Sequence, residues 1–225
     1  MQWPLVSKQM NRKILAIGVP LLLASAAPTF AVPTLTFESA SSPTITRYDA
    51  DDGASDGKIN FSGSIGNFTK VTAFADPTLG SSIDPDLNFL SLDLSSAAGG
   101  QLIVTFLDDG YTGSPLNLMA TIGGTTGAGD SVRYLTWVNN TLLTDSGSLT
   151  GPGFQSTQFA SLTQNAPYSL KLQAIITHNI DSRGLPQSTS FGARLQTTVP
   201  DGGSTAVILG VGLLGLGALR RNRNQ

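Results

Sequence analysis

The densest group of carboxylates in the chain lies in the short run from Asp49 to Gly57. Calcium prefers several oxygen ligands in one tight loop, and this run offers Asp49, Asp51, Asp52 and Asp56. The spacing departs from the EF-hand pattern, because counting from Asp49 the first glycine falls at position five rather than six. A solvated loop of turn residues is therefore the favoured interpretation, and a weak structural calcium site is the alternative.

His178 is the single histidine of the chain, so a histidine cluster for zinc is excluded. A serine triad would need this histidine beside an activated serine, and no Gly-x-Ser-x-Gly elbow occurs. The chain also has no cysteine, which removes thiol nucleophiles and thiolate metal sites. We therefore expect His178 to be a satisfied residue near the end of a strand, with no catalytic role.

Glycoside hydrolysis needs two carboxyl groups, which distant strands can supply. Glu38 is the sole glutamate, and several aspartates stand in turn contexts such as Asp76-Pro77 and Asp84-Pro85. Turn chemistry explains these aspartates directly, so a secreted hydrolase is a minor alternative. Trp137 could mark a sugar-binding face, but core packing between two sheets is the favoured interpretation for this ring. We expect no catalytic residue and no cofactor.

The elements that would position these residues are predicted to be strands. In the segment 168–178, Tyr168, Leu170, Leu172, Ala174 and Ile176 share one face, and polar residues occupy the other. This period of two is typical of an antiparallel strand over a core.

Two further segments repeat this alternation, with Val132, Tyr134, Thr136 and Val138 in one and Leu102, Val104 and Phe106 in the other. Ile103 and Leu107 make the second strand apolar on both faces. The segment 87–94 changes phase between Phe89 and Leu90, which predicts a β-bulge.

Glycine-rich turn signals separate the apolar runs, and no segment between residues 32 and 200 has a helical stripe. These signals are Asp52-Gly53, Asp56-Gly57, Gly99-Gly100, Asp109-Gly110, Gly123-Gly124 and Gly151-Pro152-Gly153. The fold class is therefore all-β, a single antiparallel, jelly-roll-like β-sandwich over residues 32–196. A short stalk at 197–203 is expected to follow it.

The charges are unevenly distributed along the chain. The formal net charge is −2, but six of the 13 basic residues lie near the two ends. The region 32–203 holds all 15 acidic residues and seven basic ones, a net charge of −8. Such a surface repels phosphate backbones, so nucleic-acid binding is excluded.

The N-terminal residues predict a secretory signal peptide over 1–31. Lys8, Arg12 and Lys13 precede the apolar run 14–24, and small residues flank a cleavage point between Ala31 and Val32. This apolar run is too short for a good permanent span. Export through the Sec translocon and cleavage by signal peptidase are the corresponding expectations.

The C-terminal residues combine a short polar motif, an apolar segment and a basic tail. The motif is Val199, Pro200, Asp201, Gly202 and Gly203. The apolar segment at 204–219 predicts a short transmembrane helix, about 22 Å long over its fifteen or so most apolar residues, and 220–225 a cytoplasmic tail. The stop-transfer cations of this tail are Arg220, Arg221 and Arg223.

This three-part order resembles the sorting signal of exosortase substrates, the PEP-CTERM class. Its closest likeness is the variant whose motif reads Val-Pro-Asp-Ser-Gly, with Gly202 in place of the serine. The resemblance covers about an eighth of the chain. It implies a partner exosortase, a transient membrane anchor and then a place at the cell surface or outside the cell.

The segment 57–113 also resembles the uncharacterised β-rich ectodomains found upstream of such signals. PEP-CTERM systems are associated with exopolysaccharide and biofilm, so the resemblance implies a non-enzymatic surface or extracellular-matrix protein. A carbohydrate-binding surface module, with calcium as an optional ligand, is the alternative function.

Overall fold

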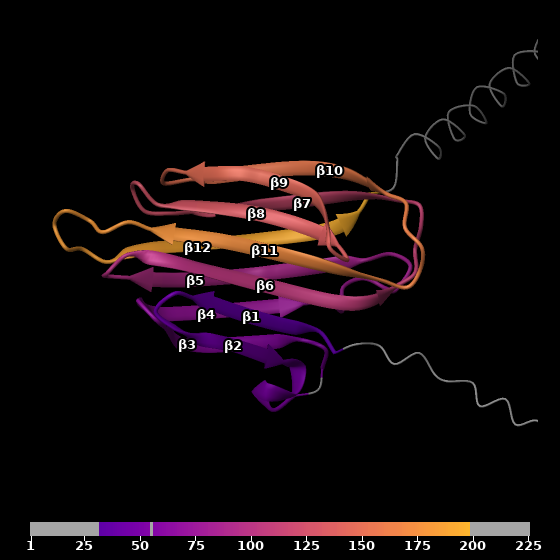
Figure 1. Ribbon diagram of the computed structural model, residues 1–225, viewed down its shortest axis with the longest axis horizontal. Coiled ribbons are helices and arrows are strands. Elements are labelled where there is room, and N and C mark those ends of the chain that lie inside the picture. The colour runs from indigo at the N-terminus through magenta and orange to yellow at the C-terminus, as the bar shows by residue number, and fades with distance from the viewer. Residues whose placement is uncertain (1–31, 55, 199–225) are drawn as a thin grey trace, which may run out of the picture.

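The computed structural model describes residues 32–54 and 56–198, and Figure 1 shows two stacked layers of strands that run along the long axis. The first sheet consists of β2 (Ser42–Tyr48), β1 (Thr34–Ser39), β6 (Gly100–Tyr111), β11 (Tyr168–His178), β8 (Ser131–Val138) and β9 (Thr141–Thr150), in that order. The second consists of β10 (Phe154–Leu162), β7 (Leu116–Thr125), β12 (Gln187–Thr197), β5 (Asp86–Ser96), β4 (Phe68–Asp76) and β3 (Ile59–Ile65). A short 3-10 turn, η1 (Asp49–Asp52), joins β2 to β3.

The eight strands from β5 to β12 have the connectivity of a jelly roll. The orders β5-β12-β7-β10 and β6-β11-β8-β9 arise because successive strands alternate between the sheets, apart from the β8–β9 hairpin. Hairpin β1–β2 extends one sheet and hairpin β3–β4 extends the other. All strand pairs are antiparallel, so the predicted fold class is confirmed for the described residues.

The core lies between the two sheets, and alternate residues of each strand supply it. In β11 every second residue from Tyr168 to His178 is buried, as the period of two predicts. Each sheet also contributes phenylalanines, and the rings of Phe89 and Phe106 meet from opposite sheets with centroids 5.7 Å apart. Burial of apolar area at about 25 cal/mol per Å² is therefore the main force that holds the layers together, since the chain has no disulfide.

The β-bulge predicted in the segment 87–94 is confirmed in β5. Strand β12 advances two residues from Phe191 to Ala193, while the paired residues of β5 run from Leu92 to Phe89. The extra residue changes the phase of the strand, so Leu87, Phe89, Leu92 and Leu94 are all buried.

Two predicted turn signals proved wrong. Gly123-Gly124 lies inside β7 and Asp109-Gly110 lies inside β6. At Gly124, a Cβ would come within 2.1 Å of the backbone oxygen of Ser190 in β12. Glycine therefore serves the close approach of two paired strands there, a role that local sequence does not distinguish from a turn.

The expected segments at the two ends of the chain fall on residues outside the described ranges: the signal peptide 1–31, the greater part of the stalk, the transmembrane helix and the basic tail. Strand β12 continues to Thr197, the first residue of the expected stalk. The next residue, Thr198, donates its backbone N–H to the oxygen of Asn117 at 2.7 Å. Within residues 32–54 and 56–198, no helix is long and apolar enough to cross a membrane.

Candidate functional site

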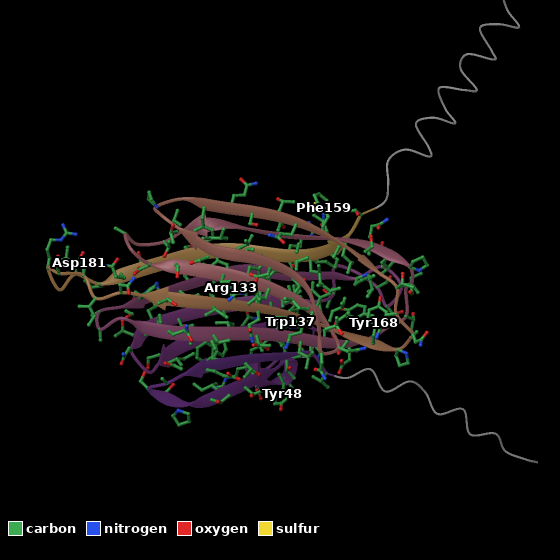
Figure 2. The ribbon with its side chains drawn as sticks, turned by 45° about the horizontal axis from the view of Figure 1, so that its top comes forward. Tyr48, Arg133, Trp137, Phe159, Tyr168 and Asp181 are labelled. Carbon is green, nitrogen blue, oxygen red and sulfur yellow. The ribbon has the colours of Figure 1, made fainter. Side chains whose placement is uncertain are left out.

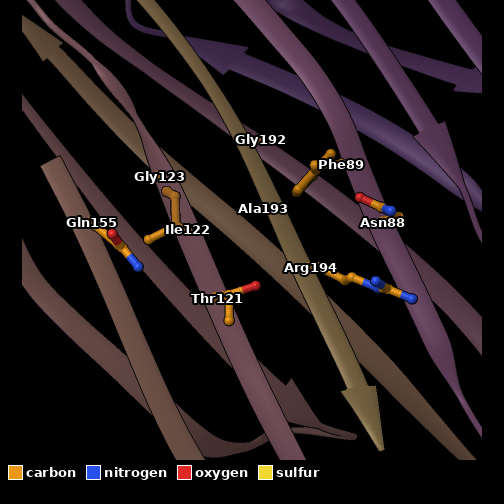
Figure 3. Close-up of a pocket in the computed structure, with 9 residues that line it drawn as sticks. All are labelled: Asn88, Phe89, Thr121, Ile122, Gly123, Gln155, Gly192, Ala193 and Arg194. Carbon is orange, nitrogen blue, oxygen red and sulfur yellow. The ribbon is translucent and has the colours of Figure 1, made fainter. Parts of the chain in front are cut away.

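A depression of about 230 Å³ lies on the outer face of the second sheet. Figure 3 shows its lining side chains on four neighbouring strands, β10, β7, β12 and β5. Its floor contains two glycines, Gly123 of β7 and Gly192 of β12, which are direct partners in the sheet. Because neither residue has a side chain, the backbone is exposed and the sheet surface is hollow at this point.

Uncharged hydrogen-bonding groups surround the glycine floor. The amides of Gln155 and Asn88 and the hydroxyl of Thr121 line the depression. Amides both donate and accept hydrogen bonds, and a hydroxyl does the same. The site therefore suits a ligand rich in hydroxyl groups.

The cation at the site is already neutralised. Arg194, which is part of the lining, forms a bidentate ion pair with Asp86 of the neighbouring strand β5, and its Nε lies 2.7 Å from Oδ1. The hydrogen bonds that Arg194 donates to Asp86 raise the pKa of Arg194. The ion pair fixes the position of the guanidinium at the rim. Because the negative charge of Asp86 balances the positive charge of Arg194, the pair attracts an anionic ligand only weakly.

The four calcium candidates lie in and beside η1, where backbone N–H groups and the side-chain amide of Asn60 donate hydrogen bonds to their oxygens. Asp49 Oδ1 accepts the N–H groups of Asp56 and Gly57 at 3.1 and 2.9 Å. Asp51 Oδ2 accepts the N–H of Tyr48 at 2.9 Å, and Asp52 accepts a hydrogen bond from Asn60 at 2.7 Å. These bonds fit the turn interpretation.

Asp56 Oδ1 accepts the N–H of Lys58 at 3.1 Å, which completes the set of local bonds. The described residues contain no group of three or more histidine, aspartate or glutamate side chains arranged to hold a metal ion. Calcium binding remains a prediction that awaits a measurement.

His178 lies at the end of β11, as predicted, and its ring is fully buried. Its Nε2 shares a hydrogen bond with Thr189 Oγ1 at 2.8 Å, and that hydroxyl shares another with Thr126 Oγ1 at 2.7 Å. Asp130, also fully buried, places Oδ2 3.9 Å from Nε2. Sequence reasoning missed these partners, because they come from two other segments, the β7–β8 connection and strand β12.

Burial lowers the pKa of His178, while the neighbouring Asp130 acts in the opposite direction. The Oδ1 atom of Asp130 accepts the N–H of Asn179 at 2.8 Å. Since both side chains of the pair are inaccessible, a substrate cannot reach them. The hydrogen bonds of the cluster join the end of β11 to β12 and to the connection between β7 and β8.

A second hollow, of about 250 Å³, lies at the other end of the sandwich and contains Asp108, Asp109 and Tyr111. Burial raises the pKa of Asp108, and the Tyr111 hydroxyl donates a hydrogen bond to Asp108 Oδ2 at 2.5 Å. A carboxyl group with a raised pKa in a hollow is the kind of group that acts as a general acid.

Trp137 is not in the core, contrary to the favoured interpretation. Its ring lies on the outer face of the first sheet (Figure 2), and the Nζ of Lys171, its direct cross-strand partner, lies 4.1 Å from the ring centroid. Leu135 lies on the same face of β8 as Trp137 and is buried, so part of this outer face is inaccessible to solvent. A cation over the ring face is favourable, so Lys171 covers the surface on which a sugar would stack.

The predicted processing residues fall outside the described ranges, with one exception. Val32, the residue after the expected cleavage point, is the first described residue and is 58% exposed. Ala31, the motif Val199 to Gly203 and the cations Arg220, Arg221 and Arg223 lie among the residues that the structure does not describe.

Comparison with known proteins finds a family match at the C-terminal end and distant likenesses to solved structures, among them two glycosidases. Residues 198–223 match the VPDSG-CTERM motif family. No curated protein matches the chain.

A β-glucosidase from Kluyveromyces marxianus in complex with glucose is 14% identical with a TM-score of 0.29, and the alignment covers 45% of this chain and 11% of that one. A GH31 α-xylosidase from Xanthomonas citri is 7% identical with a TM-score of 0.28, and the alignment covers 73% of this chain and 16% of that one. This chain thus spans less than a fifth of either enzyme, and the low scores carry no argument about function.

The family match falls on the residues whose motif, apolar segment and cations resembled an exosortase signal. It therefore supports export and sorting by an exosortase. The chain carries a PEP-CTERM-like sorting domain, with a VPDSG-CTERM motif at residues 198–223 that follows a jelly-roll β-sandwich.

Proposed function

We propose that this protein is a non-enzymatic surface or extracellular-matrix protein that binds exopolysaccharide after exosortase processing. A signal peptide at 1–31 directs it through the Sec translocon, and signal peptidase cuts after Ala31. The apolar segment at 204–219 then serves as a transient membrane anchor. The sorting motif supports the route, and the outer face of the second sheet supports the binding.

The observation that carries the binding proposal is the side-by-side pair Gly123 and Gly192. Their missing side chains create a hollow beside the amides of Gln155 and Asn88, which suit the hydroxyl groups of a sugar. Preformed hollows with a few well-placed polar groups are typical of ligand sites. The hollow holds about 230 Å³, which is room for a short stretch of polysaccharide and not for a large ligand.

The charge of the protein selects the class of polysaccharide. The region 32–203 has a net charge of −8, and Arg194 at the rim is paired with Asp86. An acidic polysaccharide would meet long-range repulsion without a free cation to offset it in the hollow. The proposed ligand is therefore a neutral polysaccharide.

A glycan array with the exported protein tests this proposal. Neutral glycans should be retained, and Gln155→Ala should weaken the retention at least severalfold because it removes an amide from the hollow. Gln101→Ala is the matched control, since Gln101 is an exposed glutamine of β6 in the other sheet. Absence of glycan binding, or equal losses in the two variants, would overturn the binding proposal and leave the export route intact.

Asp108 favours a second candidate function, a secreted glycoside hydrolase. Burial raises the pKa of this carboxyl in the hollow beside Tyr111, as a general acid requires. Assays of the exported protein on a panel of polysaccharides decide between the two candidates. Hydrolysis that disappears in Asp108→Asn would favour the enzyme, and no hydrolysis with the native protein would remove it.

A further inference from the structure

The two sheets have four edge strands: β2 and β9 in the first, β10 and β3 in the second. An edge strand exposes unpaired backbone groups that can pair with another strand, and proteins commonly block such edges. Three of the four edges here are interrupted. Strand β2 contains Pro43, the pairing of β3 shifts register between Gly63 and Ile65, and the pairing of β9 has two register shifts and contains Asp145.

Strand β10 has none of these features. Its nine residues pair with β7 without a register shift, from Phe154 opposite Gly124 to Leu162 opposite Leu116. It contains no proline and no charged residue, and neither does its neighbour β7. In the part of the chain that the structure describes, the other side of β10 pairs with no strand.

An exposed aromatic ring accompanies this open edge. Phe159 is 71% exposed on the outer face of β10, and Figure 2 shows it beside the rim of the sandwich. Its neighbours on that face of the strand are Thr157 and Ser161, which carry no charge. Strand β10 thus combines a straight, uncharged backbone edge with an apolar side chain that gains from burial.

We propose that β10 is an interface at which two copies of this chain pair edge to edge. An antiparallel pair centred on Gln158 sets Phe154 of one copy opposite Leu162 of the other. In the same register, Phe159 of each copy lies opposite Thr157 of the other, because the arrangement has two-fold symmetry. Each cross-strand pair is free of charge, and aromatic residues opposite β-branched ones stabilise antiparallel sheets.

The distribution of charge favours this edge over the rest of the surface. Two copies with a net charge of −8 in residues 32–203 repel one another in most orientations. Strands β7 and β10 together form a border of the second sheet without ionisable groups, so pairing along β10 aligns no charged residues of these two strands. The dimer should therefore depend on protein concentration and strengthen as salt screens the remaining repulsion.

A cysteine at the symmetry position tests the register directly. The chain has no cysteine, so a single introduced thiol can form a disulfide only with a second copy. In Gln158→Cys the two thiols face each other, with Cα atoms about 4.5–5.5 Å apart, within the range of a disulfide. Thr44→Cys, at an exposed position of the interrupted edge β2, is the matched control.

The full-length chain, purified in detergent and mildly oxidised, should give a covalent dimer with Gln158→Cys that a reductant reverses. Thr44→Cys should stay largely monomeric under the same conditions. Equal cross-linking in the two variants would overturn the proposal. The proposal would also be overturned if the rate of disulfide formation in Gln158→Cys were no higher than the rate expected for random collisions between exposed thiols.

Sedimentation of the unmodified full-length chain supplies a second, independent test. Gln158→Lys sets two like charges opposite each other and should abolish the concentration-dependent dimer, while Thr44→Lys should leave it intact. Thr157→Lys, at an exposed position of β10, replaces Gln158→Lys if that variant does not fold. A native protein that is monomeric at every concentration, or a lysine variant of β10 that still dimerises, would overturn the proposal.

Discussion

The imidazole of His178 and the carboxylate of Asp130 lie side by side in the interior, with Nε2 3.9 Å from Oδ2 and both side chains fully buried. Burial lowers the pKa of His178, so the folded protein takes up this proton only below the ordinary value of 6.5. The unfolded chain takes it up at that ordinary value. The proton therefore favours the unfolded state, and stability is lost as the pH falls below 6.5.

The first prediction follows from this pair. The free energy of unfolding should fall as the pH drops below 6.5, with a slope of at most about 1.4 kcal/mol per pH unit for one proton. Since His178 is the only histidine, His178→Gln should flatten the slope in this window. Urea unfolding at a series of pH values measures it, and an unchanged slope in the variant would assign the proton to another group.

The second prediction concerns the acidic turn. Asp49→Ala removes the acceptor for two backbone N–H groups and should lower the free energy of unfolding by about 1 kcal/mol. If the carboxylates serve only the turn, calcium and a chelator should leave the melting temperature of the native protein unchanged. A rise with calcium that Asp49→Ala abolishes would instead establish the calcium site.

The third prediction concerns the hydrogen bond from Tyr111 to Asp108. This bond lowers the pKa of Asp108 against the larger opposing effect of burial. Tyr111→Phe should therefore raise that pKa further and lower the free energy of unfolding at neutral pH by about 1–3 kcal/mol, because a buried carboxylate loses its donor.

The loss in Tyr111→Phe should shrink as the pH falls toward the ordinary aspartate value of 3.8, because the folded carboxyl, with its raised pKa, then binds a proton in both proteins. Urea unfolding of both proteins at neutral and acidic pH checks this dependence. A loss of equal size at both values would show that the missing hydroxyl acts through packing alone.

The fourth prediction compares two adjacent glycines of β7. Gly124→Ala should lower the free energy of unfolding by about 1–3 kcal/mol, because its Cβ would lie 2.1 Å from the oxygen of Ser190. Gly123→Ala should change it by no more than about 0.5 kcal/mol, since the nearest atom would be 3.7 Å away. Thermal melts of both variants measure the contrast, and similar melting temperatures would contradict it.

The fifth prediction concerns processing at the two ends. Intact-mass spectrometry of the native protein should show the loss of residues 1–31 and of the tail after the motif Val199 to Gly203. Asp201→Ala should block the second cut and leave the first unaffected. A mature species that still ends at Gln225 in a cell with an exosortase would contradict the processing route.

Periodicity predicted the parts of the fold that depend on burial. The alternation in β11 and the phase change in β5 were both correct, because one buried face determines which residues must be apolar. Trp137 was placed wrongly for a related reason. Both faces of β8 carry apolar residues, so the sequence pattern alone could not show which face of the strand, and hence whether Trp137, belongs to the core.

The candidate site was beyond prediction, because it depends on register between distant strands. Gly123 and Gly192 are 69 residues apart in the chain, and only the pairing of β7 with β12 makes them neighbours. The partners of His178 were missed for the same reason, since Thr126 and Asp130 lie in the connection between β7 and β8, and Thr189 lies in β12. A two-residue glycine signal is equally compatible with a turn and with a hollow.

The described chain starts and finishes at the same end of the sandwich, beside the first residues of β1 and the last of β12 (Figure 1). A tether attached after Thr198 would therefore hold the molecule by that end alone. The opposite end, which includes the connection between β11 and β12 with Asp181 (Figure 2), would then be the part of the domain farthest from the tether. The outer faces of both sheets would remain accessible to neighbouring molecules.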